Sequence, residues 1–273
     1  MAPTLAPYSD AVRPEEGRRP IAVVLAAGKG TRMGSDLPKV VHEAAGKPLV
    51  RWVVDALREA GIDEVIVVVG HRAELVEACL TDAPGVAFAL QREQRGTGDA
   101  VAAAADQIEQ RIAGGDRGRP VVIVCGDSPM LRPESVRGLL ERFASERAAC
   151  LLGTAVTADP QGLGRIVRDT AGRFQRIVEQ KDASPEERAI REVNMSTYVF
   201  AADALLRALS RLDNANASGE YYLTDCPGIL LAEGCVVDAV ACLAPSESLS
   251  VNTPEQLAEV AEALRSRPTA SES

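Results

Sequence analysis

A glycine-rich stretch that carries basic side chains is the part of this sequence best suited to chemistry. A strand ending in such a loop offers backbone N–H groups to an anion, and basic side chains add positive charge. The pattern therefore predicts a phosphate-binding loop, the alternative being a glycine turn with solvated cations. The stretch reads Leu25-Ala26-Ala27-Gly28-Lys29-Gly30-Thr31-Arg32-Met33 and is followed by Pro38-Lys39.

Two common phosphate-binding motifs do not fit this stretch. A Walker A loop has Gly-Lys followed by Ser or Thr, with another glycine five residues earlier. Here Gly30 follows Lys29, and position 23 is valine. A dinucleotide-binding fingerprint needs a glycine at position 33, which is methionine, and Pro38 disfavours a helix that continues from the loop. The loop is therefore expected to bind phosphate in another way.

Asp127 is a second residue whose side chain is suited to chemistry. It ends the apolar run of residues 120–127. Ligands of open α/β sheets bind at the carboxyl ends of the strands, so we expect this carboxylate to face a ligand. The alternative is an aspartate that only caps its own loop.

The hydrophobic pattern indicates the elements that position these side chains. Continuous apolar strands between helices are typical of a mostly parallel sheet covered on both faces, so the fold class is doubly wound α/β. After residue 148 the links are shorter, and Asp169-Thr170-Ala171-Gly172 predicts a hairpin turn. The expected strands are 21–27, 65–70, 86–90, 120–127, 149–156, 164–169, 173–180, 192–201 and 235–242; the expected helices are 48–61, 133–145, 202–211 and 254–265, with two more beginning at Ala73 and after Gly98.

We expect one mixed-sheet domain over residues 20–266. Residues 1–19 lack the apolar core of a signal peptide, and residues 267–273 are polar, so both ends are expected to be flexible tails.

Composition and charge exclude several classes of protein. With 30 basic and 39 acidic residues and a net charge of -9, the chain lacks the broad basic face that nucleic acid or an anionic membrane requires. Its apolar runs are far shorter than the roughly 20 residues of a membrane span. The cysteines show no C-x-x-C spacing, and His42 and His71 are the only histidines, so neither a zinc cluster nor a disulfide framework is predicted. We expect a cytoplasmic protein.

The glycine-rich loop and several later stretches, in the same order, resemble the sugar-1-phosphate nucleotidyltransferases. The resemblance is strongest to the uridylyltransferase half of bacterial bifunctional N-acetylglucosamine-1-phosphate uridylyltransferases. The later stretches are 91–98, 125–129, 162–166, 178–183, 192–194, 219–225 and 251–252.

This resemblance implies a Rossmann-like, three-layer α/β/α nucleotide-diphospho-sugar transferase fold. The implied reaction makes UDP-N-acetylglucosamine and pyrophosphate from UTP and N-acetylglucosamine 1-phosphate, with Mg²⁺ as cofactor. Arg32, Lys39 and Asp127 are the implied catalytic residues, and Asp127 and Asn252 the implied metal ligands. The sequence Val-Asn-Thr-Pro around Asn252 equally reads as the N-cap of the last helix.

The resemblance also assigns the two substrate halves. Gln91 with Gly96 and Thr97 would read the uracil edge, since an amide supplies donor and acceptor together; Gly-Thr-Gly alone would only start a helix, with Thr97 as a possible N-cap. The implied nucleotide-binding residues are Leu25, Ala26, Ala27, Gly28, Gly30, Thr31, Gln91, Gly96 and Thr97, and the implied sugar-binding residues are Gly164, Glu179, Asn194 and Thr224.

The sequence departs from its relatives at a few positions. Asp99 replaces a common histidine, and Met195-Ser196 replaces Thr-Gly beside the expected sugar pocket. The alternatives are therefore the same chemistry with glucose 1-phosphate, N-acetylmuramate 1-phosphate or dTTP, or a non-catalytic regulatory domain that binds a nucleotide sugar. We expect no β-helix acetyltransferase domain, because hexapeptide repeats are absent, and a monomer or weak homodimer.

Overall fold

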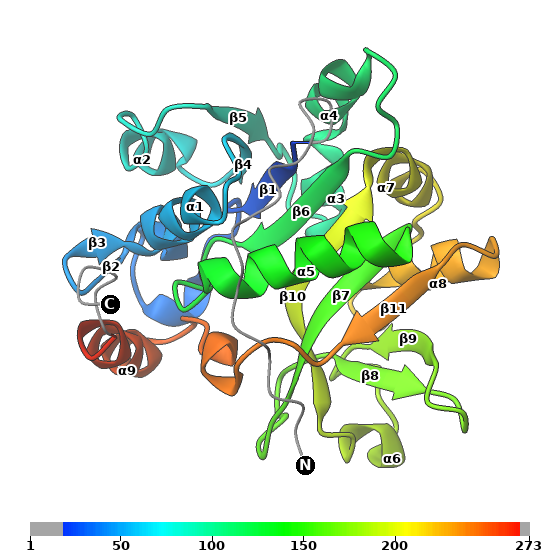
Figure 1. Ribbon diagram of the computed structural model, residues 1–273. Coiled ribbons are helices and arrows are strands. Elements are labelled where there is room, and N and C mark those ends of the chain that lie inside the picture. Colours follow the sequence, from blue (N-terminus) through cyan, green and yellow to red (C-terminus); the bar gives the residue numbers. More distant parts are fainter. Residues whose placement is uncertain (1–18, 268–273) are drawn as a thin grey trace.

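One twisted sheet organises the part of the chain that the structure, a computed structural model, describes: residues 19–267 (Figure 1). Residues 1–18 and 268–273 lie outside the described residues, and with them most of the two predicted tails. In spatial order the main strands are β11 (Val237–Val240), β7 (Cys150–Val156), β10 (Glu192–Ala201), β6 (Pro120–Cys125), β1 (Ile21–Leu25), β4 (Glu64–Val69) and β5 (Val86–Leu90).

The sheet has a parallel part and an antiparallel strand, β10. Strands β6, β1, β4 and β5 are parallel, whereas β10 runs antiparallel to both β6 and β7. The start of β10 therefore lies at the same edge as the carboxyl ends of β1 and β6. A hairpin of β8 (Arg165–Arg168) and β9 (Phe174–Val178) joins the sheet through β10, and β2 (Glu43–Ala44) pairs separately with β3 (Lys47–Pro48). The predicted mixed sheet is confirmed.

Helices cover both faces of the sheet, as the alternation of its buried side chains requires. Along β1, Ile21 and Val23 pack into one core, and Ala22 and Val24 pack into the other. One face is covered by α1 (Leu49–Glu59), α2 (Ala73–Ala78) and α5 (Pro133–Glu146); the other by α3 (Thr97–Ala102), α4 (Ala105–Ile112), α7 (Ala202–Leu209) and α8 (Cys226–Ala232) (Figure 1). These are the three predicted layers.

The remaining helical elements are short or lie at the rim. They are α6 (Pro185–Arg188), α9 (Pro254–Arg265) and the 3₁₀ turns η1 (Thr31–Met33), η2 (Lys39–Val41), η3 (Leu223–Asp225) and η4 (Pro245–Ser248). Within residues 19–267, no helix is both long and apolar enough to cross a membrane.

The structure corrects two details of the segment after Gly96. The single helix expected there is two helices, α3 and α4, separated by a turn at Ala103 and Ala104. Gly96 is the N-cap residue of α3, so Thr97 does not cap it. The Thr97 hydroxyl instead accepts a hydrogen bond from the Leu223 N–H at 3.0 Å, which ties α3 to the segment before α8.

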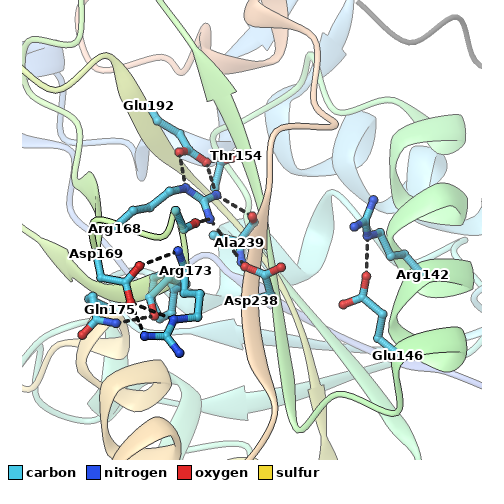
Figure 2. Close-up of polar contacts among 12 residues, drawn as sticks. Arg142, Glu146, Thr154, Arg168, Asp169, Arg173, Gln175, Glu192, Asp238 and Ala239 are labelled. Carbon is cyan, nitrogen blue, oxygen red and sulfur yellow. Dashed lines mark hydrogen bonds and ion pairs between the residues drawn. The ribbon is translucent and has the colours of Figure 1, made fainter.

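The hairpin turn predicted at residues 169–172 is present. The Asp169 carboxylate accepts from the N–H groups of Ala171 and Arg173, both at 2.9 Å, and Gly172 takes a positive φ of 80°. Figure 2 shows the adjacent Arg168 guanidinium, which donates to the Glu192 carboxylate and to the Ala239 carbonyl. This network ties the hairpin to the start of β10 and to β11.

Two helical glycines are expected to respond oppositely to substitution by alanine. Gly138 is exposed within α5, and a Cβ there would meet no atom within 4 Å. Gly138→Ala should raise the free energy of unfolding by about 0.5–1 kcal/mol, because alanine loses less entropy in a helix. A Cβ on Gly98 in α3 would lie 2.4 Å from Leu212 Cδ1 and 3.0 Å from the Tyr221 carbonyl oxygen, so Gly98→Ala should lower it. Urea unfolding measures both, and a shift of the same sign in the two variants would contradict this packing.

Candidate active site

Four polar side chains from three segments that are distant in sequence meet beyond the carboxyl ends of β1 and β6. The Lys39 ammonium forms an ion pair with Asp127 Oδ2 and donates to Asn252 Oδ1 at 2.9 Å. Arg32 Nη2 donates to the same Asn252 oxygen at 2.8 Å. The structure thus brings the three predicted catalytic residues and both predicted metal ligands into one contact set.

The loop after β1 takes its path from glycine and proline. Gly30 has φ 68°, and a Cβ on it would lie 2.5 Å from Lys39 Cβ, so the loop can close on Lys39 only with glycine there. Pro38 precedes the single turn η2, which begins at Lys39. On the other side, the Gly126 N–H donates to the Leu25 carbonyl at 2.9 Å, which holds Asp127 beside the end of β1.

Asn252 reaches the site on the segment between η4 and α9. The Val251 N–H donates to the Asp127 carbonyl oxygen at 3.1 Å, and the Gln256 side chain accepts from the Asn252 N–H at 2.8 Å. The N-cap of α9 is Thr253, whose side chain accepts from the Gln256 N–H. The capping interpretation of Asn252 is therefore wrong, because its side-chain oxygen faces Arg32 and Lys39 instead.

Asp127 and Asn252 offer a donor set that fits a hard divalent cation. Both contribute oxygen, which Mg²⁺-like ions prefer, and such ions keep waters or substrate phosphates as their remaining ligands. One cationic group, the Lys39 ammonium, already contacts both oxygens, so a single cation is able to bridge them. Among the described residues there is no group of three or more His, Cys, Asp and Glu side chains that could form an all-protein metal cage.

The rest of the glycine-rich loop is open on its outer side. Leu25 ends β1, Ala26 and Ala27 are buried behind it, and Gly28 and Thr31 are exposed. A Cβ on Gly28 would meet no atom within 4 Å, so the space next to its backbone is free for a ligand.

Gln91 lies two strands away, just beyond β5. Neighbouring strands are about 4.8 Å apart, so Gln91 is roughly 10 Å across the sheet from the end of β1. Its side chain is buried, and its amide group donates to Asp99 Oδ2 at 2.8 Å and to the Gly96 carbonyl at 3.2 Å. Gly96 itself has φ 118°, and a Cβ would lie 2.4 Å from the Tyr221 carbonyl oxygen.

The four predicted sugar-binding residues form a second group around the start of β10. The Thr224 hydroxyl donates to Glu179 Oε1 at 3.0 Å, and the Asn194 N–H donates to the Gly164 carbonyl at 2.8 Å. Burial raises the pKa of Glu179, and the Thr224 hydrogen bond opposes that shift. A Cβ on Gly164 would lie 3.7 Å from Glu179 Oε1, so these residues are close neighbours.

A cavity of about 130 Å³ is lined by members of both groups, Asp127 and Asn252 from the first and Asn194 from the second. Burial raises the pKa of Cys125, which also lines it, to about 12, so this thiol stays protonated and is no nucleophile at neutral pH. Ser196, another lining residue, has φ 50° at a bulge where β10 shifts register. Bulges of this kind re-aim side chains next to ligand sites.

Sequence reasoning missed residues that position the site from behind. The buried Glu247 carboxylate accepts from the Arg132 N–H, the Ser135 hydroxyl and the Ala244 N–H, and so anchors the segment that leads to Asn252. Arg165, 1% exposed, donates to Gln180 Oε1 at 2.7 Å and steadies the segments around Gly164 and Glu179. Glu247 belongs to none of the stretches that carry the resemblance, and Arg165 belongs to the stretch 162–166, where nothing in the sequence distinguishes a buried positioning arginine from a surface charge.

Comparisons with known proteins place this chain among relatives of similar sequence. The bifunctional protein GlmU of Geobacter metallireducens is 46% identical over 246 residues, which are 90% of this chain and 50% of that protein. This identity confirms the resemblance that the motifs indicate. The chain spans about half the length of the curated relatives it matches.

Solved structures of lower identity share the fold. Apo UDP-glucose pyrophosphorylase aligns with a TM-score of 0.71 and 15% identity over 90% of this chain and 98% of that one. A putative glucose-1-phosphate thymidylyltransferase from Bacillus anthracis aligns with a TM-score of 0.71 and 16% identity over 92% and 97%. The fold is therefore the expected Rossmann-like nucleotide-diphospho-sugar transferase fold. The model of the MobA-like NTP transferase domain matches residues 22–222, and the chain belongs to that family.

Proposed function

We propose that this chain transfers the uridylyl group of UTP to N-acetylglucosamine 1-phosphate and releases pyrophosphate. The observation that carries the proposal is the contact set of Arg32, Lys39, Asp127 and Asn252 beside an open glycine-rich loop. Simple nucleotide-sugar binding would not require a carboxylate and an amide oxygen converging on one cation.

The reaction needs positioning and charge compensation more than proton transfer. The phosphate of a sugar 1-phosphate is anionic at pH 7, so one of its oxygens attacks the α-phosphorus without a general base. The new P–O bond forms as the bond to the β-phosphate bridging oxygen breaks, and pyrophosphate takes the electron pair. Arg32 and Lys39, freed from Asn252, offset the charge on the reacting phosphates.

Nucleotidyltransferases of this family generally use a divalent metal, and we propose Mg²⁺ here. Asp127 and Asn252 would hold it, because their oxygens converge on one cationic group. When bound, Mg²⁺ neutralises phosphate charge and orients the reacting oxygens.

Different residues of the site are proposed to bind the nucleotide and the sugar phosphate. The loop from Leu25 to Thr31 faces the triphosphate, and Gln91, Gly96 and Thr97 face the base. Asn194 lines the cavity, and Glu179, Thr224 and the backbone at Gly164 lie next to Asn194. We assign these four residues to the sugar, since carboxylate, amide and hydroxyl groups suit sugar hydroxyls and an N-acetyl group.

Other sugar 1-phosphates are specific alternatives to N-acetylglucosamine 1-phosphate as the substrate. Ser196 places a hydroxyl-bearing residue on the cavity wall, and Met195 lines the same wall. Related sequences have Thr-Gly at these two positions, so glucose 1-phosphate and N-acetylmuramate 1-phosphate are tested as alternative sugar substrates. The alternative nucleotide, dTTP, is tested beside them.

We also propose that the protein is a cytoplasmic monomer or weak homodimer whose residues 20–266 form one domain. Six free cysteines within the described residues are compatible with a reducing compartment. Light scattering of the purified chain tests the oligomeric state, and a stable trimer would overturn it.

Lys39→Ala and Asp127→Asn should each lower turnover at least tenfold. The first removes a cation from the phosphates, and the second removes a charged oxygen from the metal site. Pyrophosphate release measures both effects. Lys47→Ala is the control, since Lys47 is held by Asp55 and by the Trp52 ring and contacts none of the site residues. Near-normal turnover in either site variant would remove that residue from the mechanism.

A substrate matrix tests the reaction itself. UTP, dTTP and CTP are each combined with the 1-phosphates of N-acetylglucosamine, glucosamine, glucose and N-acetylmuramate in the presence of Mg²⁺. We expect the fastest pyrophosphate release with UTP and N-acetylglucosamine 1-phosphate. A different best pair would reassign the substrate, and no release with any pair would favour a non-catalytic binding domain.

Glu179→Gln should stabilise the fold while weakening the use of the sugar phosphate. Because burial raises the pKa of Glu179 above its ordinary value of 4.5, the charged form is costly in the folded state. That cost is absent below the unfolded pKa and complete above the raised folded pKa. The variant should therefore be more stable than the natural protein at pH 8, with the gain disappearing as the pH falls to 4, and its KM for the sugar phosphate should rise.

Urea unfolding at the two pH values and steady-state kinetics measure these effects. Glu109→Gln, an exposed position on α4, is the control for loss of a negative charge. A gain in stability that does not depend on pH would contradict the assigned cause.

A further inference from the structure

Asp99 contacts Gln91, the side chain proposed to read the base, and its contacts bear on how the Gln91 amide is oriented. Its two carboxylate oxygens have different partners: Oδ2 accepts from Gln91 Nε2 at 2.8 Å, and Oδ1 accepts from Arg95 Nη2 at 2.8 Å. Asp99 lies in the first turn of α3, and its side chain is 15% exposed. The carboxylate is thus held from one side by a guanidinium and presented to the Gln91 amide from the other.

The orientation of the Gln91 amide follows from the chemistry of its partners. A carboxylate and a backbone carbonyl are acceptors only, so both must face the NH₂ end of the amide. Asp99 Oδ2 and the Gly96 carbonyl occupy its two N–H donors. The opposite end, Oε1, has no hydrogen-bond partner in the part of the chain that the structure describes, and it is the group left for a ligand.

An acceptor in this position discriminates between pyrimidines. Uracil and thymine carry an N–H donor at N3, whereas N3 of cytosine is an acceptor. A fixed Oε1 accepts a hydrogen bond from uracil or thymine and faces a lone pair on N3 of cytosine. A site built around one hydrogen-bonding pattern rejects the analogue that cannot match it, because buried polar groups are left unpaired.

We propose that Asp99 is a positioning residue for base selection: it locks Gln91 with Oε1 towards the nucleotide, so that the site accepts uridine or thymidine triphosphate and rejects CTP. This inference rests on the proposed base-reading role of Gln91. It assigns Asp99 no contact with substrate and no part in the transfer step.

The test is the ratio of kcat/KM for UTP to that for CTP in Asp99→Asn. Asparagine keeps the size of the side chain, but it also offers an NH₂ group that pairs with Gln91 Oε1. The Gln91 amide is then free to reverse and present its donor end to N3 of cytosine, opposed only by the longer contact with Gly96. We expect the UTP preference to fall roughly fivefold or more, by loss of UTP efficiency and gain of CTP efficiency. Asp99→Ala, which removes the acceptor, should relax the preference in the same direction.

Asp106→Asn is the matched control, because it makes the same charge change at an exposed position in the first turn of α4. An unchanged UTP-to-CTP ratio in both Asp99 variants, with folded protein by circular dichroism, would overturn the proposal. Equal loss of efficiency for both nucleotides would also overturn it, since it would show a merely structural role.

Equilibrium binding of UTP and CTP, measured by calorimetry without sugar phosphate, separates this inference from the proposed reaction. A UTP preference in binding that depends on Asp99 would support the inference even if no pyrophosphate were released. Turnover of UTP with a preference that does not depend on Asp99 would leave the reaction in place and reject the inference.

Discussion

The site depends on one interaction, the contact of the Lys39 ammonium with Asp127 and Asn252. It joins three segments that come from the beginning, the middle and the end of the fold. The parallel pairing of β1 with β6 makes the contact possible, because strands that run together end together. The Lys39 and Asp127 side chains are only 17% and 18% exposed, so each requires a partner of opposite charge when no ligand is bound. Arg32 adds a second cation on the exposed side.

The fold follows from the sequence where the signal is periodic. The apolar runs on either side of the glycine-rich loop predict strands, and β10 and α9 have the predicted bounds of residues 192–201 and 254–265. The break between α3 and α4 escapes prediction, because a run of alanines favours helix throughout and only tertiary packing stops it. The N-cap that was the alternative interpretation of Asn252 is Thr253, one residue later, and a sequence of two adjacent capping residues does not distinguish them.

Much of the candidate site is also predictable, because its residues belong to motifs. The motifs do not include all the residues that hold the motif residues in place. Glu247 gathers three hydrogen bonds and Asp99 fixes an amide, yet each is a single acidic residue in a polar segment. Two of the three partners of Glu247 lie more than a hundred residues away in the sequence, and Asp99 contacts Gln91 eight residues before it, across a loop. Contacts of this kind exist only after the chain has folded.

The reversed direction of β10 has a consequence for how the protein is divided. Because β10 is antiparallel to β6, its first residues and the β8–β9 hairpin reach the ligand edge from outside the parallel layer that carries the glycine-rich loop. The surface proposed to face the acceptor is thus built on a separate piece of backbone from the surface proposed to face the donor. Residues 192–194 of β10 pair with β7, the β8–β9 hairpin pairs with itself and with β10, and β6 pairs with residues 198–201 of β10, so a change of length or side chain in the first residues of β10 or in the hairpin does not touch a pair of β6. We infer that such a change alters the proposed acceptor surface while the strands behind the glycine-rich loop keep their register.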